Sequence, residues 1–268
     1  MMFSEDYTTQ HQHFEQFVQD FVQGHETPQQ KDIDKFIQEI KTLERYAVDS
    51  KRFYILFDHS KFYAAYISAN LEKEAGYSID YILKQGLLFW FQKIHWKQLT
   101  LAYKFNKWGL KFQKECGIHI PSSQYEIWIC GIKFKNKWNR WKTYLLKQRI
   151  LTNTKKNQAL LSFIEVEDIS SFYKADFAWY RPTCIIDGKR LARAYFSHGS
   201  KKEFPDILSE RETEILKLAA QQKSNQEISE LLEISKNTVE RHRKNMIARV
   251  GVTDMTALLR IGRILKII

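Results

Sequence analysis

Residues 234–250, with the sequence ISKNTVERHRKNMIARV, concentrate side chains that could contact phosphates and the edges of bases. Besides Lys236, four cationic side chains and a histidine lie within nine residues: Arg241, His242, Arg243, Lys244 and Arg249. Lysine and arginine neutralise phosphates, and an arginine can donate two hydrogen bonds to one guanine. The stretch therefore predicts a helix that contacts nucleic acid.

Glu240 carries the opposite charge in the middle of this stretch. A carboxylate repels phosphates, but it can accept a hydrogen bond from cytosine N4. Two interpretations stay open. Glu240 selects among bases, or it forms an i,i+4 pair with Lys244 that stabilises the helix by about 0.2–0.5 kcal/mol.

Four amphipathic helices over residues 208–262 are needed to position this stretch. Each begins at a side chain that can cap its first turn: Ser209, Ser224, Ser235 and Asp254. Glu212, three positions after Ser209, completes a capping box at the first helix. Residues at helical spacing form the expected inward faces: Ile215, Leu216, Leu218, Ile228, Leu231, Leu232, Val239, His242, Met246, Val250, Leu258, Leu259 and Ile261. Only residues 233–235 join the second helix to the third, which predicts a helix-turn-helix.

The stretch LSERETEILKLAAQQKSNQEISELLEISKNTVERHRKNMIARVGV resembles, over its whole length, the C-terminal DNA-binding domain of LuxR-type transcription regulators. The resemblance implies that the third helix enters the major groove. It points to Glu240, Arg241 and Lys244 as nearest the base edges, and to Lys236, Thr238 and Arg243 as facing phosphates. With Asn237 on the outward face, the expected DNA-binding residues are Lys236, Asn237, Thr238, Glu240, Arg241, Arg243 and Lys244. Gln222 departs from the family pattern, which has glycine there, so that turn is expected to be strained or differently capped.

The chain before this domain is expected to be α+β. Residues 10–47 suggest two amphipathic helices, the second capped by Thr27 and carrying Ile33, Phe36, Ile37, Ile40 and Leu43 on one face. Two strand-like runs follow, then helical stretches over residues 71–83 and 89–114, then three strand-like runs that suit an antiparallel meander. The sequence YAAYISANLEKEAGYSIDYIL (residues 63–83) resembles the PAS-domain pattern, which implies a sensor or dimerisation module. Asp187-Gly188 predicts a further hairpin.

These observations divide the chain into an N-terminal helical pair (1–47), a PAS-like domain with an extra hairpin (48–196), a linker (197–206) and a LuxR-type domain (207–268). The predicted fold class is an α+β, PAS-like antiparallel sheet domain followed by an all-α, four-helix domain. Because two small helices cannot bury their apolar faces against each other alone, residues 1–47 must pack on the next domain or on a second subunit.

The formal charge of +11 favours acidic partners, and residues 133–156 contain nine basic and no acidic residues. That run is interpreted as a solvated sheet face, with additional DNA contact as the alternative. Three widely spaced cysteines predict neither a disulfide framework nor a zinc site. The polar N-terminus and the lack of an 18-residue apolar run predict a cytoplasmic protein that does not span a membrane.

Other candidate residues receive structural interpretations. His95 and His119 lack partners at metal-ligand spacing, Cys130 is expected in the core, and Trp128, Trp138, Trp141 and Tyr144 are expected to pack in the core or an interface. No cofactor or enzymatic motif is predicted. The expected function is a dimeric transcription regulator that binds double-stranded DNA, with a possible small-molecule ligand in the PAS-like domain. The rivals are a module that docks on protein partners and an enzyme built on the PAS-like pocket; a salt-dependent, sequence-specific DNA shift distinguishes the regulator from the docking module.

Overall fold

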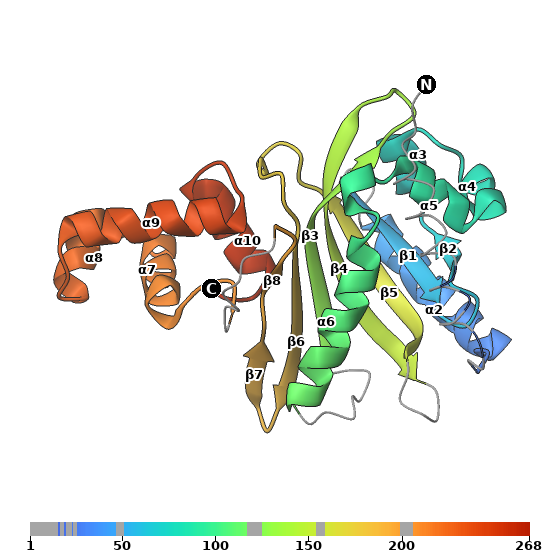
Figure 1. The fold of residues 1–268 in the computed structure, drawn as a ribbon, viewed down its shortest axis with the longest axis horizontal. Coiled ribbons are helices and arrows are strands. Elements are labelled where there is room, and N and C mark those ends of the chain that lie inside the picture. The colour runs from blue at the N-terminus through green and yellow to red at the C-terminus, as the bar shows by residue number, and fades with distance from the viewer. Residues whose placement is uncertain are drawn as a thin grey trace.

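The structure is a computed structural model that describes residues 16, 19, 23, 26–46, 51–116, 125–153, 159–198 and 206–268. Figure 1 shows an antiparallel sheet in the N-terminal part of the chain and a group of helices at its C-terminal end. The expected class, an α+β sheet domain followed by an all-α domain, is confirmed.

One antiparallel sheet organises the N-terminal part. Its strands are β1 (Arg52–Asp58), β2 (Tyr63–Ile67), β3 (Tyr125–Lys135), β4 (Trp141–Asn153), β5 (Ala159–Asp168), β6 (Trp179–Ile186), β7 (Lys189–Ala192) and β8 (Tyr195–Phe196). Their order is β2-β1-β5-β4-β3-β6-β7, and β8 also pairs with β6. Asp187 and Gly188 have φ of 49° and 74°, as a two-residue type I′ turn requires, so the hairpin of β6 and β7 is confirmed.

Short helices between β2 and β3 cover one face of the sheet, which we call the helix face. They are α3 (Asn70–Ala75), α4 (Ile79–Gln85), α5 (Leu87–Lys93), the 3-10 helix η1 (Trp96–Gln98) and α6 (Leu101–Cys116). Phe53 and Val166 on this face pack with Leu71 of α3 and Phe89 of α5. Farther along the sheet, Phe112 of α6 packs on Tyr125. The core of the sheet domain therefore lies under these helices.

Two of the expected helices are broken. Residues 71–83 form α3 and α4, because Gly76 takes a left-handed conformation (φ 77°) and Ser78 starts a new helix. Residues 89–114 are interrupted because the backbone of His95 is extended, and its Nδ1 accepts a hydrogen bond from the Lys97 amide (3.3 Å). His95 thus has a structural role as a cap.

The opposite face, which we call the docking face, carries helix α2 (Gln30–Arg45) at one end. Ile33 and Ile40 of α2 are buried against Leu56 and Phe163 of β1 and β5. Thr27 is not the cap of α2, because Asp32 and Ile33 both donate to the carbonyl of Gln29, which is therefore the N-cap residue. Of the helix expected earlier, around Phe14–Val22, the structure describes only Gln16 and Gln19, which are helical, and the apolar residues of that helix lie outside the described part.

The C-terminal helices occupy the other end of the docking face: α7 (Glu210–Ala220), α8 (Asn225–Leu231), α9 (Lys236–Val250) and α10 (Met255–Ile264). Figure 1 shows them beside β6 and β8, at the end of the molecule opposite to α2. They share one core with five residues of the strands: Trp128, Cys130, Leu145, Trp179 and Phe196. Trp128 and Cys130 are thus core residues, as expected.

Main-chain hydrogen bonds join the two domains directly. In the loop between β5 and β6, the Lys174 amide donates to the carbonyl of Gly251 (2.9 Å), and the carbonyl of Phe172 accepts from the Thr253 amide (3.0 Å). The Trp179 indole donates to the carbonyl of Val250 (3.1 Å). The domains are therefore docked on each other, although residues 199–205 of the expected linker lie outside the described part. Among the described residues, no helix is both long and apolar enough to cross a membrane.

Candidate nucleic-acid interface

Side-chain caps fix where each C-terminal helix begins. Ser209 and Ser224 form capping boxes with Glu212 and Glu227, Ser235 caps α9, and the Asp254 carboxylate caps α10. Each cap satisfies amides that the first helical turn leaves without a partner. All four predicted caps are confirmed, and the cap at Ser235 sets the start of the basic helix.

The apolar side of α9 is buried as predicted, with Val239, Met246 and Val250 in the domain core. His242 is only half-buried. The inward placement of Leu231 is wrong, because that side chain is 57% exposed. Leu231 is the last residue of α8, and the chain turns there, so helical spacing no longer decides which side a residue faces.

The opposite side of α9 carries the predicted DNA-binding residues. Four of them are exposed: Lys236, Asn237, Arg241 and Lys244. Three are half-buried: Thr238, Glu240 and Arg243. The exposed side chains hold three positive charges and no negative one, so this face can accept a polyanion. Thr238 also takes part in the cap, since its hydroxyl lies 2.8 Å from that of Ser235.

Arg249, the last cation of the basic stretch, does not belong to this face. Its guanidinium pairs with the Glu212 carboxylate at the start of α7, and Glu212 is only 3% exposed. Burial alone raises the pKa of Glu212, but the Arg249 pair and the hydrogen bonds from Ser209 together hold that pKa below its ordinary value. Arg249 therefore fastens α9 to α7.

Glu240 is held by the neighbouring helix rather than by its own. Its Oε1 accepts from the Asn225 amide in a long contact of 3.4 Å, and within the described chain it forms no ion pair with Lys244. The Asn225 side-chain oxygen accepts from the Arg243 guanidinium (2.5 Å). Asn225 thus joins a carboxylate and a cation of α9 to the first turn of α8. No sequence pattern predicts these contacts of Asn225, since only the fold brings α8 and α9 together.

The turn after α7 is strained at Gln222, where the family pattern has glycine. Gln222 has a φ of 64°, the left-handed region that costs a residue with a Cβ about 1–2 kcal/mol. The Lys223 amide donates to the carbonyl of Leu218 (3.2 Å) and the Gln222 amide to that of Ala219 (3.0 Å). These two bonds are those of a Schellman motif, so the cap expected for glycine is kept by glutamine.

Residues 206–261 match the model of a family described as bacterial regulatory proteins, luxR family (GerE). The C-terminal domain is a LuxR-type helix-turn-helix domain. Within it, α8 and α9 are the helix-turn-helix pair, and α9 is the helix that carries the cationic face.

Two regulators are similar to this chain over its LuxR-type domain. The transcriptional activator protein EchR of Dickeya chrysanthemi is 38% identical over 65 residues, which are 24% of this chain and 26% of EchR. The transcriptional regulatory protein MctR of Rhizobium johnstonii is 42% identical over 59 residues, 22% of this chain and 28% of MctR. The chain therefore spans about a quarter of the length of either relative.

A solved structure of the Vibrio cholerae VqmA dimer, from work on LuxR-type receptors, aligns with 85% of this chain and 88% of that one. The identity is 11% and the TM-score 0.30. A superposition with so low a score transfers no property to this chain.

The sheet domain offers little space for a ligand under the helices of its helix face. Between α4, α5 and the sheet, the described residues line a cavity of about 10 Å³, which holds about one water molecule. Tyr144 is buried in the core there, as expected. Trp138 and Trp141 are 58% and 46% exposed, so they do not lie in the core, and packing in an interface stays a prediction for them. They lie at the β3–β4 turn, where strand alternation and the chain reversal direct them to solvent.

The basic run of β3 and β4 is partly neutralised by ion pairs. Lys133 pairs with Asp176 (2.7 Å), and Lys142 with Asp168 (2.5 Å). Lys147 pairs with Glu126 at 3.2 Å. These pairs favour the interpretation of a solvated sheet face.

Proposed function

We propose that this protein is a sequence-specific transcription regulator that binds double-stranded DNA through the exposed face of α9. The observation that carries the proposal is the row of outward cations on a capped helix whose apolar side is buried in a LuxR-type domain. Arg241 and Lys244 suit guanine O6 and N7, and Glu240 suits cytosine N4. Lys236, Thr238 and Arg243 would face phosphates, and Asn237 lies beside them on the outward side.

We further propose that it binds DNA as a homodimer in the cytoplasm. One recognition helix reads few base pairs, so two copies on neighbouring half-sites are needed for useful specificity. The PAS-like sheet domain would mediate dimerisation or sense a ligand. On the helix face, a ligand larger than water would have to displace α4 or α5, because the cavity there is about 10 Å³.

The dimer contact proposed for residues 1–47 has less support than the DNA face. Ile33 and Ile40 of α2 are used within the chain, which leaves Leu43 (43% exposed) and Tyr46 (88% exposed) on the described part of this segment. Leu258 and Ile261 of α10, the alternative contact, are buried in the LuxR-type domain. Sedimentation of the full chain and of a variant lacking residues 1–25 tests the N-terminal segment directly.

Selection of duplexes from a random DNA pool by the full-length chain tests DNA binding. We expect one enriched sequence family and a logarithm of affinity that falls linearly with the logarithm of salt, by about 0.9 per neutralised phosphate. The double variant Arg241→Gln, Lys244→Gln should lose the preference and lower the salt slope.

The matched control is Lys73→Gln, Lys84→Gln, which removes the same charge from exposed positions on α3 and α4. It should keep the selected sequence. If no sequence is enriched, or if both double variants weaken binding alike, the α9 face is not a DNA reader and the protein-docking alternative takes its place.

A further inference from the structure

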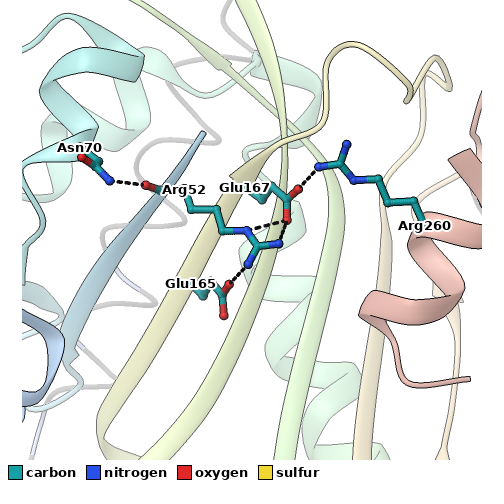
Figure 2. Close-up of polar contacts among 5 residues, drawn as sticks. All are labelled: Arg52, Asn70, Glu165, Glu167 and Arg260. Carbon is teal, nitrogen blue, oxygen red and sulfur yellow. Dashed lines mark hydrogen bonds and ion pairs between the residues drawn. The ribbon is translucent and has the colours of Figure 1, made fainter. Parts of the chain in front are cut away.

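A chain of polar contacts runs from α3 to α10 by way of the docking face (Figure 2). The Asn70 side-chain amide donates to the carbonyl of Arg52, the first residue of β1 (3.1 Å). The Arg52 guanidinium pairs with Glu165 (3.2 Å) and Glu167 (3.0 Å) on β5. Glu167 pairs in turn with Arg260 of α10. We call these five residues the relay.

Glu167 is the centre of the relay because both of its oxygens are used. Oε2 faces Arg52 and Oε1 faces Arg260, and the side chain is only 7% exposed. A carboxylate this buried depends on its partners, so the loss of either arginine leaves it less compensated. The guanidinium of Arg260 also lies 4.6 Å from the centre of the Phe172 ring. Arg260 therefore fastens α10 to two elements of the sheet domain.

The relay reaches solvent at its two arginines. It borders a cleft of about 190 Å³ between the sheet and α10, lined by Arg52, Trp128, Leu145, Lys147, Glu165, Glu167 and Ile264. The side chains of Arg52 and Arg260 are 40% and 52% exposed. Water can replace the partners of such half-exposed cations at little cost, unlike those of a fully buried pair. The contacts at Arg52 and Arg260 are therefore the ends of the relay that can exchange with water.

The relay also connects the two faces of the sheet. Asn70 starts α3, which packs on the helix face through Leu71, whereas the Arg52 side chain lies on the docking face beside Glu167. Asn70 reaches Arg52 through its backbone, so a shift of α3 acts on the start of β1. The helices next to α3 are those that must move for the 10 Å³ cavity to hold anything larger than water.

We propose that the relay couples the position of α3 to the docking of the LuxR-type domain. With the contacts in place, α10 is held on the sheet. Withdrawal of Asn70 from Arg52 loosens the arginine, weakens its hold on Glu167 and shifts the LuxR-type domain toward the undocked state. The sheet domain thereby controls how firmly the DNA-binding helices are oriented.

Hydrogen exchange of the free full-length protein tests this without DNA. The amides of Lys174, Ala175 and Thr253 donate across the domain boundary, so their exchange reports undocking. We expect Arg260→Gln to accelerate exchange at these amides about tenfold, the loss of one charge-assisted hydrogen bond. Arg263→Gln removes the same charge from an exposed position of α10 and should leave them unchanged. Equal exchange in the two variants would overturn the proposal.

Asn70→Ala tests the connection across the sheet. It should accelerate exchange at the Lys174 and Thr253 amides, whereas Lys73→Ala, an exposed neighbour on α3, should not. Amides of the β4–β5 ladder should stay protected, which shows that the sheet is intact. In the Arg260→Gln background, Asn70→Ala should accelerate exchange at these amides little further. If the two effects multiply, or if Asn70→Ala matches Lys73→Ala, the relay does not couple the faces.

Because the exchange measurement uses no DNA, it can contradict the coupling proposal while the proposed DNA binding is confirmed. Equally, the proposed DNA binding can be contradicted while the exchange measurement supports the coupling.

Discussion

At the scale of single residues, the α9 face separates exposed cations, for which we propose contacts with bases, from cations that other residues of the domain hold. Arg241 and Lys244 are exposed, whereas Arg243 is tied to Asn225 and Arg249 to Glu212. A side chain with an internal partner has less freedom to adapt to different bases. The cations of one basic stretch therefore have different roles, although their charge is the same.

Arg241→Ala should weaken binding to the selected operator by about 1–3 kcal/mol and relax the preference at one base position. The reason is that a bidentate contact to guanine is lost while the rest of the helix stays in place. Lys236→Ala, at the first position of α9, should weaken binding to all DNA sequences about equally. Base selection with both variants checks this, and a uniform loss in both would mean that Arg241 contacts only phosphates.

Glu240→Gln separates charge from geometry. Glutamine keeps an oxygen for the Asn225 amide, so the helix should remain as stable as in the parent chain. If Glu240 selects bases, Glu240→Gln should bind random DNA more strongly, since a charge that repels phosphates is gone. The difference in affinity between the operator and random DNA should then become smaller. Glu240→Lys should go further and steepen the salt slope by about one to two.

Selections with these two variants at two salt concentrations measure both effects. If both retain the parent's preferred site, Glu240 has no part in base selection and serves only its contact with α8.

At the scale of elements, the LuxR-type domain combines strong caps with one unfavourable turn. Gln222→Gly should stabilise the domain by about 0.5–1 kcal/mol, because glycine adopts a φ of 64° without a Cβ clash. Gln221, the residue before it, has a φ of −83°, so Gln221→Gly should destabilise by a similar amount through chain entropy. Denaturant unfolding of both variants provides the measurement, and opposite signs are required.

The Glu212–Arg249 pair predicts how the stability of the domain depends on pH. The pKa of folded Glu212 lies below its ordinary value, so its contribution is complete above the unfolded pKa and is lost as pH falls through the folded pKa. Stability should therefore decline below about pH 4.5, by up to about 1.4 kcal/mol per pH unit for this group.

Glu212→Gln should flatten the decline, and Arg249→Met should reduce it, because burial of the carboxyl is then opposed only by the Ser209 contacts. Unfolding free energies measured between pH 6 and pH 3 decide the matter. An unchanged slope in Glu212→Gln would assign the acid sensitivity to other groups.

The features that the sequence predicted are those with local causes. Ser209, Ser224, Ser235 and Asp254 act within one helical turn, and the Asp187-Gly188 turn acts within one hairpin. The helix breaks at Gly76 and His95 were missed because apolar spacing continues across both of them. Where the chain turns, as at Leu231, spacing ceases to indicate burial.

At the scale of the whole molecule, the docked arrangement had no signal in the sequence. Glu167 and Arg260 lie 93 positions apart, and each is an ordinary charged residue of its own strand or helix. Asn225 and Glu240, 15 positions apart, meet only once α8 and α9 have packed. Contacts of this kind follow from the fold and cannot be read from periodicity or from caps.

Docking should also affect how tightly the operator is bound. The cationic face of α9 is exposed while α10 rests on the sheet, so the docked orientation is compatible with DNA. In a dimer, two recognition helices must lie about 34 Å apart to meet successive half-sites. A domain that is docked only part of the time presents this arrangement only in that fraction of molecules, and its apparent affinity falls accordingly.

We therefore expect Arg260→Gln to bind the selected operator more weakly than Arg263→Gln, by at most about tenfold, the limit set by a tenfold change in the docking equilibrium. Both variants lose one positive charge from α10, so their general electrostatic loss is shared and the difference reports docking. The preferred sequence should stay the same in both, because neither residue lies on α9. Titration of each full-length variant with the operator measures the ratio. Tighter binding by Arg260→Gln would mean instead that the docked orientation restrains the DNA-binding helices.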